Sequence, residues 1–162
     1  MSIPWPSGPV VAVVGAGDAD ARLLGLAERV GEELARRRAT LVCGGLGGVM
    51  AAACRGAKRA AGLTVGILPG ADRRDANAWL DVAIPTGMGE ARNVLVVRSA
   101  DAVIAVGGGY GTLSEIALAL KLGRRVVGMG TWELARHGRP DRAIVVVEDA
   151  VEAATRALAD LV

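Results

Sequence analysis

The feature that most constrains the fold is a regular alternation of short β-branched runs with longer stretches of helical periodicity. Runs rich in Val, Ile and Leu have strand length at residues 10–14, 40–43, 64–68, 82–84, 102–106, 125–129 and 144–147. Helix-like stretches lie between them at 21–38, 49–61, 91–99, 114–122 and 151–161. This alternation predicts an α/β, Rossmann-like, doubly wound fold, with a mainly parallel sheet of about seven strands and helices on both faces.

The chain length indicates a single domain. Its 162 residues are enough for a substantial core but few for two domains. We predict an N-terminal arm at residues 1–8 and one Rossmann-like domain at residues 9–162. The longest irregular segments are predicted at 69–77 and 130–141. In open α/β sheets ligands bind beyond the carboxyl ends of the strands, so the glycine-rich loops after strands are the places to look for a site.

Composition and charge narrow the choice of partner. The chain is 52% hydrophobic with no Phe and a single Tyr, so few aromatic rings are available to stack on nucleic-acid bases. The net charge of +2 comes from 19 basic and 17 acidic residues spread along the chain, without a basic tract. We therefore expect a small-molecule partner and no nucleic acid.

The two cysteines and the hydropathy pattern bear on location. Cys43 and Cys54 lack metal-ligand spacing and are interpreted as buried thiols of a reducing compartment, so no metal site is expected. No apolar run approaches the roughly 20 residues needed to cross a bilayer. The proline-rich start is unlike a targeting helix. These features predict a cytoplasmic protein without a membrane partner.

Two glycine clusters follow the first two predicted strands. The first, at residues 15–18, resembles a dinucleotide fingerprint but has Asp20 in place of the third glycine, which disfavours a nicotinamide dehydrogenase. The second, at residues 44–50, either directs backbone amides at an anion or forms a tight turn where backbones pack closely. Gly15, Gly44 and Gly45 are predicted to contact a ligand.

The third cluster is the strongest site signal. It follows the apolar run 102–106 and opens a helix, so its amides and the positive end of the helix dipole can hold a phosphate. The Thr112 hydroxyl can add a hydrogen bond. The loop has no Lys, so it is not a Walker loop. The predicted phosphate-binding residues of this loop are Gly107, Gly108, Gly109, Tyr110, Gly111 and Thr112.

Two charged residues near this loop each have two interpretations. Thr112 and Glu115 have the spacing of a capping box, in which Thr112 caps the helix. Alternatively, Glu115 is a carboxylate beside the phosphate loop that activates water or stabilises a cationic transition state. Arg92 is either a solvated surface residue or the cation that accompanies Glu115, because loops after neighbouring parallel strands meet at one edge.

The motifs together are similar to those of a known family. Residues 41–50 (LVCGGLGGVM), 65–70 (VGILPG), 91–93 (ARN) and 107–115 (GGGYGTLSE) resemble the Lonely Guy (LOG-like) superfamily. The resemblance is closest to a bacterial branch related to molybdenum-cofactor carrier proteins. It implies that Arg92 and Glu115 are catalytic positions and that Asn93, which stands where the family has Lys, lies in the ligand site. Gly107 replaces the proline of the family motif.

The resemblance implies two functions. The first is binding of a nucleotide-type ligand with hydrolysis of the N-glycosidic bond of a nucleoside 5′-monophosphate, which would make the chain a phosphoribohydrolase. The alternative is a non-catalytic carrier or sensor of a phosphorylated ligand such as molybdenum cofactor. No cofactor is required; the ligand expected is a nucleotide, phosphate or a molybdopterin-type molecule. LOG-like relatives form oligomers, so a homodimer or homotetramer is expected.

Overall fold

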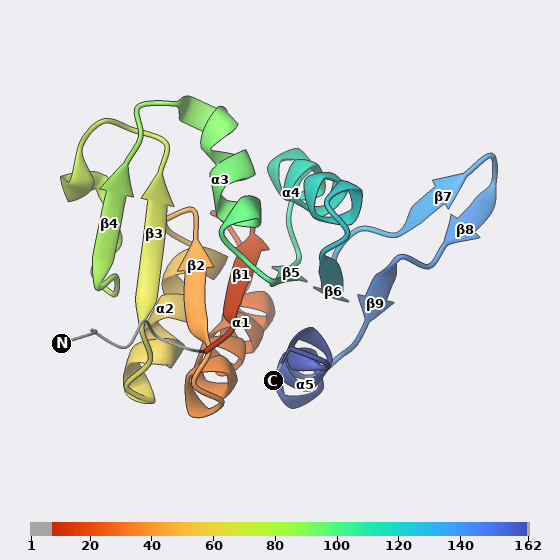
Figure 1. Cartoon of the computed structure of the whole chain (residues 1–162), viewed down its shortest axis with the longest axis horizontal. Helices are drawn as coiled ribbons and strands as arrows, with labels where there is room; N and C mark the ends of the chain where they lie inside the picture. The colour runs from red at the N-terminus through yellow and green to blue at the C-terminus, as the bar shows by residue number, and fades with distance from the viewer. Residues whose placement is uncertain (1–7, 162) are drawn as a thin grey trace, which may run out of the picture.

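The computed structural model describes residues 8–161, and the arm predicted at residues 1–8 lies outside them except for Gly8. Its centre is a seven-stranded sheet with the order β4-β3-β2-β1-β5-β6-β9, and every neighbouring pair is parallel (Figure 1). This confirms the predicted single-domain Rossmann-like fold. The strands are β1 (Val10–Gly15), β2 (Thr40–Cys43), β3 (Thr64–Leu68), β4 (Val82–Pro85), β5 (Ala102–Val106), β6 (Arg125–Met129) and β9 (Ile144–Val146).

Helices cover both faces of the sheet and divide the core in two. The helices are α1 (Ala21–Arg36), α2 (Val49–Arg59), α3 (Asn93–Arg98), α4 (Tyr110–Lys121) and α5 (Ala150–Leu158), with 3-10 turns η1 (Arg73–Asp75) and η2 (Gly89–Arg92). Successive strand side chains point to opposite faces. Val11 and Val13 of β1 accordingly pack with α1, α2 and α5, whereas Ala12 and Val14 pack with α3 and α4.

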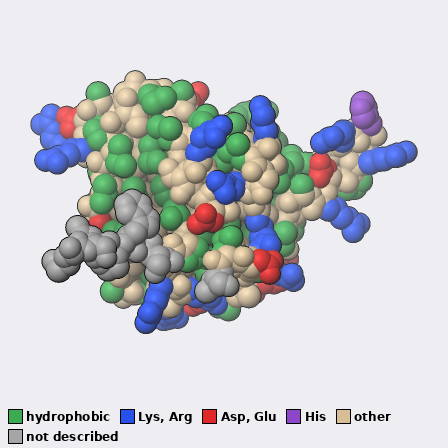
Figure 2. Space-filling model, in the orientation of Figure 1, with side chains coloured by type: hydrophobic (Ala, Val, Ile, Leu, Met, Phe, Trp, Pro, Cys, Tyr) green, Lys and Arg blue, Asp and Glu red, His purple; other side chains and the backbone are tan. Residues whose placement is uncertain are grey.

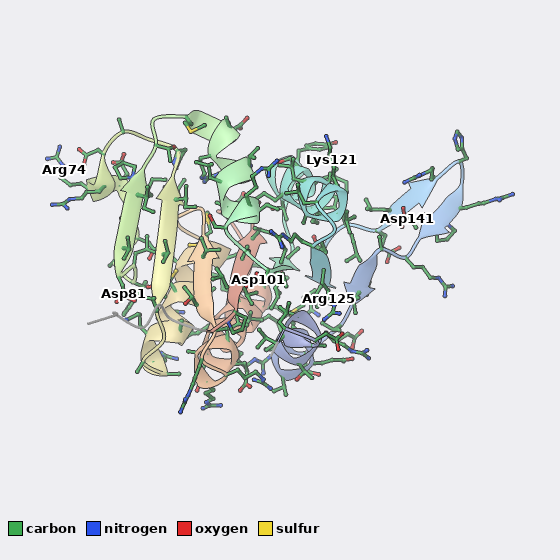
Figure 3. All side chains as sticks on the ribbon, viewed as in Figure 1. Arg74, Asp81, Asp101, Lys121, Arg125 and Asp141 are labelled. Carbon is green, nitrogen blue, oxygen red and sulfur yellow. The ribbon has the colours of Figure 1, made fainter. Side chains whose placement is uncertain are left out.

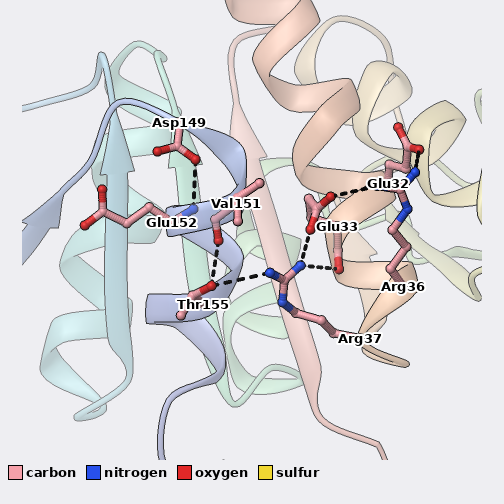
Figure 4. Close-up of polar contacts among 8 residues, drawn as sticks. All are labelled: Glu32, Glu33, Arg36, Arg37, Asp149, Val151, Glu152 and Thr155. Carbon is pink, nitrogen blue, oxygen red and sulfur yellow. Dashed lines mark hydrogen bonds and ion pairs between the residues drawn. The ribbon is translucent and has the colours of Figure 1, made fainter.

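Short polar contacts fix the ends of the elements. The Asp101 carboxylate, labelled in Figure 3, accepts a hydrogen bond of 2.9 Å from the Val10 amide at the start of β1. In Figure 4, Arg37 at the end of α1 donates to the Thr155 hydroxyl of α5 at 3.4 Å and to the Glu33 carbonyl at 3.1 Å. Asp149 caps α5 by accepting from the Glu152 amide. The bond from Arg37 to Thr155 joins α1 to α5, which lie on the same face of the sheet.

Within the segment 130–141, predicted to be irregular, residues 134–141 form a β-hairpin. Strands β7 (Leu134–Arg136) and β8 (Arg139–Asp141) pair antiparallel, and the hairpin projects from the body with the histidine at its far end (Figure 2). His137 and Gly138 have φ of 51° and 75°, as a two-residue type I′ turn requires. The prediction was wrong because these strands are three residues long and their turn lacks the usual Asn-Gly signal.

The sheet order places a crevice at one point of its carboxyl edge. Strand order reverses between the neighbours β1 and β5, since the chain proceeds outward to β2 from one and to β6 from the other. The loops after such strands diverge and leave room for a ligand. Among residues 8–161, no helix is both long and apolar enough to span a membrane.

Candidate functional site

A cavity of about 280 Å³ lies at the carboxyl ends of β1 and β5. It combines the loop after β1, the start of α2, the η2–α3 junction and the first turns of α4. Fourteen residues line it: Val13, Val14, Gly15, Ala16, Gly17, Asp18, Gly44, Met50, Arg92, Asn93, Gly109, Gly111, Thr112 and Glu115. The topology therefore brings four segments that are distant in sequence to one site, as the strand-end rule predicts.

The glycine loop after β5 gives this cavity the N-terminus of α4. Gly109 is the N-cap and has an extended backbone, with φ −100° and ψ −151°. The first intrahelical bond is donated by the Leu113 amide to the Gly109 carbonyl at 3.0 Å, so the amides of Tyr110, Gly111 and Thr112 have no intrahelical acceptors. The capping-box interpretation is wrong, because Thr112 lies inside the first turn and Gly109 caps without a side chain.

Three of the predicted loop residues lie outside the cavity lining. Gly107 and Gly108 have φ of 57° and 106° and form the turn itself; the Gly107 amide donates to the Met129 carbonyl at 2.9 Å. Tyr110 is 82% exposed, and its ring lies 5.5 Å from that of Trp132. These residues shape the loop, while Gly109, Gly111 and Thr112 face the cavity.

The other two glycine clusters pack against each other. The Val49 amide, at the start of α2, donates to the Ala16 carbonyl at 3.0 Å. A Cβ on Gly48 would lie 2.3 Å from that same oxygen. The second cluster thus serves mainly as a close-packed turn, and of its glycines only Gly44 lines the cavity. Gly15 lines the cavity, whereas Gly45 does not.

Arg92 is buried, with 8% of its surface exposed, so the surface interpretation is wrong. Its Nε donates to the Ile67 carbonyl at 2.8 Å and its Nη2 to the Gly44 carbonyl at 3.2 Å. Its Nη1 donates to Oδ1 of Asn93, whose Nδ2 donates to the Ser114 hydroxyl at 3.4 Å. The guanidinium therefore joins the ends of β2 and β3 to α3 and, through Asn93, to α4.

Glu115 is 7% exposed and lines the same cavity. Burial raises the pKa of Glu115 to about 7, and the nearby charge of Arg92 opposes this shift only in part. Among residues 8–161, no hydrogen bond or ion pair to this carboxyl accompanies the shift. Arg92 and Glu115 line one cavity, as predicted, but they form no ion pair with each other.

Several lining residues were not predicted from the sequence. Val13 and Val14 end β1, and the strand-end rule would have indicated them. Ala16, Gly17 and Asp18 belong to the first glycine cluster and Met50 belongs to the second, but a cluster alone does not say which of its residues face the cavity. Within the described part of the chain, no group of three His, Cys, Asp or Glu residues could hold a metal ion.

Comparison with known proteins identifies the family. A model described as the SLOG cluster4 family matches residues 8–155. The chain belongs to the SLOG cluster4 family. An uncharacterized protein of Archaeoglobus fulgidus is 52% identical over 120 residues, which is 74% of this chain and 78% of that protein.

Two solved structures are similar to this chain in both sequence and fold. The molybdenum cofactor binding protein of Rippkaea orientalis is 43% identical with a TM-score of 0.75, covering 77% of each chain. The molybdenum cofactor carrier protein of Chlamydomonas reinhardtii is 33% identical with a TM-score of 0.81, covering 91% of this chain and 94% of that one. The expected relationship to the carrier branch of the LOG-like superfamily is confirmed.

Proposed function

We propose that this chain binds and carries a phosphorylated ligand of the molybdenum-cofactor type, without turnover. Both solved relatives are described as molybdenum cofactor binding or carrier proteins. These relatives favour the carrier alternative over the phosphoribohydrolase expected first, since neither is described as a hydrolase. The proposal rests on sequence identities of 43% and 33% over most of the chain.

The observation that carries the proposal is the position of the α4 N-terminus at the rim of the cavity. Gly109 and Gly111 line the cavity and are exposed, so a phosphate can reach the free amides of the first turn. A helix N-terminus adds about half a positive charge to such a site. A cavity of about 280 Å³ accommodates one small molecule.

Gly111→Glu tests this placement of the phosphate. A Cβ on Gly111 meets nothing within 4 Å and its φ is not positive, so the variant should fold while setting a carboxylate among the amides. Gly25→Glu is the matched control, because Gly25 is an exposed position of α1 with equally open surroundings. Anaerobic titration with molybdenum cofactor should show saturable binding by the parent and Gly25→Glu, and at least tenfold weaker binding by Gly111→Glu.

The same purified proteins decide between carrying and hydrolysis. Incubation with a panel of nucleoside 5′-monophosphates should release no free base, measured by chromatography. Base release by the parent that is lost in Gly111→Glu would overturn the carrier proposal in favour of a phosphoribohydrolase. Equal cofactor binding by all three proteins would remove the α4 N-terminus from the site.

The proposal includes a cytoplasmic homo-oligomer. Self-association is supported by an apolar surface on the edge strand β4, where Val82 and Ile84 are each 45% exposed. These side chains share a sheet face with Val65 and Ile67, and that face is buried further along the sheet under α3 and α4. Light scattering coupled to gel filtration should give a mass above that of one chain, and Ile84→Glu should reduce it.

A further inference from the structure

The polar groups of the cavity change in character from rim to floor. At the rim, the exposed Gly109 and Gly111 present helix amides, which are donors for an anion. At the floor lie Arg92, Asn93 and Glu115, each 7–8% exposed. A ligand in this cavity therefore meets the helix amides and the exposed Asp18 carboxylate first, and a buried cluster of charged and amide side chains below them.

Most hydrogen-bonding capacity at the floor is already used. Arg92 donates to two backbone carbonyls and to Asn93. Asn93 accepts that bond on Oδ1 and donates from Nδ2 to Ser114. Among the described residues the Glu115 carboxyl alone at the floor is without a hydrogen-bond partner. Because Glu115 lines the cavity, a ligand that enters it can donate hydrogen bonds to this carboxyl group.

The chemistry of a carboxyl group limits which part of a ligand it can take. A phosphate beside it would place two anions together in a region of low dielectric, which is unfavourable. Two parallel N–H donors instead match the two oxygens of a carboxylate. The 2-amino-4-oxopyrimidine edge, shared by pterins and guanine, presents a ring N–H and an exocyclic amino group side by side.

We propose that Glu115 recognises the 2-amino-4-oxopyrimidine edge of the ligand's heterocycle at the cavity floor, while the ligand's phosphate occupies the α4 N-terminus at the rim. This inference rests on the proposed function, because it assigns one end of the same phosphorylated ligand. It makes Glu115 a specificity-determining residue. It also orients the ligand, with the ring inward and the phosphate outward.

The proposed orientation predicts that ligand binding near pH 7 releases a proton from Glu115. In the free protein burial holds the pKa of Glu115 at about 7. Two N–H donors favour the charged carboxylate and lower this pKa, so binding near pH 7 releases a proton. A phosphate at Glu115 would instead favour the protonated form and take up a proton. The other ionisable groups that line the cavity are Asp18 and Arg92, and the buried Cys43 thiol lies close enough to interact with the charges of Arg92 and Glu115.

The test uses ligand pairs that differ at the recognised edge. One pair is 6-hydroxymethylpterin monophosphate and its 2,4-dioxo lumazine analogue; the other is GMP and IMP, which lacks the 2-amino group. Calorimetric titration should show about tenfold or greater preference for the 2-amino member, as expected for one hydrogen bond to a charged group. Tighter binding of the pterin pair would indicate a pterin ligand, and tighter binding of the GMP pair would indicate a guanine ligand.

Two variants assign the preference to Glu115. Glu115→Gln has the same shape but offers one donor and one acceptor, so the preference should fall below threefold. Glu148→Gln, at an exposed position outside the cavity, should retain it. Titration in buffers of different ionisation enthalpy measures the number of protons released on binding. The parent should release more protons than Glu115→Gln. The protons that the variant still releases come from ionisation of the ligand's phosphate.

The outcomes separate this inference from the proposed function. Equal affinities within both pairs, a preference unchanged in Glu115→Gln, or proton uptake attributable to Glu115 would each overturn the inference. So would the absence of binding by all four probes. The carrier proposal is decided independently by the molybdenum cofactor titration, which can succeed when every probe pair fails to discriminate.

Discussion

Replacing Glu115 by Gln should stabilise the ligand-free protein, and the gain should depend on pH. The carboxyl group is buried and has a pKa of about 7 against an ordinary value of 4.5. Because the folded state binds this proton more tightly than the unfolded state, folding stability from this group is fully present below pH 4.5. It is lost as the pH rises through 7.

The magnitude follows from the size of the shift. Ionising the buried carboxyl costs about 3 kcal/mol of stability at pH 8, about 1 kcal/mol at pH 5 and almost nothing at pH 4. Glutamine has no charge to bury, so Glu115→Gln should recover those amounts. For a domain of this size, about 3 kcal/mol corresponds to a rise in Tm of roughly 6–12 °C.

Urea unfolding of the parent and the variant at pH 5 and pH 8 measures the effect. The midpoint of Glu115→Gln should exceed that of the parent clearly at pH 8 and slightly at pH 5. Glu148→Gln, whose side chain is exposed, should follow the parent at both values. An equal gain at the two pH values, or none at pH 8, would refute the argument that burial raises the pKa of this carboxyl.

Three further predictions concern the frame of the site. Gly48→Ala should destabilise the fold by about 2 kcal/mol or more in urea unfolding, because φ is +62° and the added Cβ would lie 2.3 Å from a backbone oxygen. Gly47→Ala is the control. It has open space around the added Cβ, so its stability should stay within about 0.5 kcal/mol of the parent's. Arg92→Met should cost about 2–4 kcal/mol by that measurement, since two carbonyls lose their donor; a neutral effect would contradict its bridging role. Cys43 and Cys54 are fully buried, so a thiol reagent should label neither in the native protein and both in denaturant.

The sequence was sufficient for the sheet but not for the finer backbone. Buried parallel strands are continuous apolar runs, and the ends of β2, β3, β5 and β6 agree with the prediction to the residue. The start of α4 was predicted four residues late, because side-chain capping patterns carry no information about a helix whose N-cap is glycine. The hairpin at 134–141 was missed since its two strands bury little and therefore show no alternation.

The site was only partly predictable for a related reason. Motif spacing brought Arg92, Glu115 and the glycine loop together, and all three contribute to one cavity. Spacing does not say which way an amide or a guanidinium points. That Gly45, Gly107 and Gly108 turn away from the cavity depends on backbone angles set by neighbouring strands, and these are tertiary properties.

The hydrogen bonds of Arg92 determine whether its guanidinium can move toward a ligand. A guanidinium that donates to the Ile67 and Gly44 carbonyls and to Asn93 is held in place by three elements. Moving it toward a ligand would leave two buried carbonyls without donors, at a cost of about 1–3 kcal/mol each. Arg92 is therefore suited to fixing the floor on which the heterocycle rests. Under the proposed carrier function, Glu115 would be the floor group that discriminates between ligands, and a ligand could bind without moving Arg92.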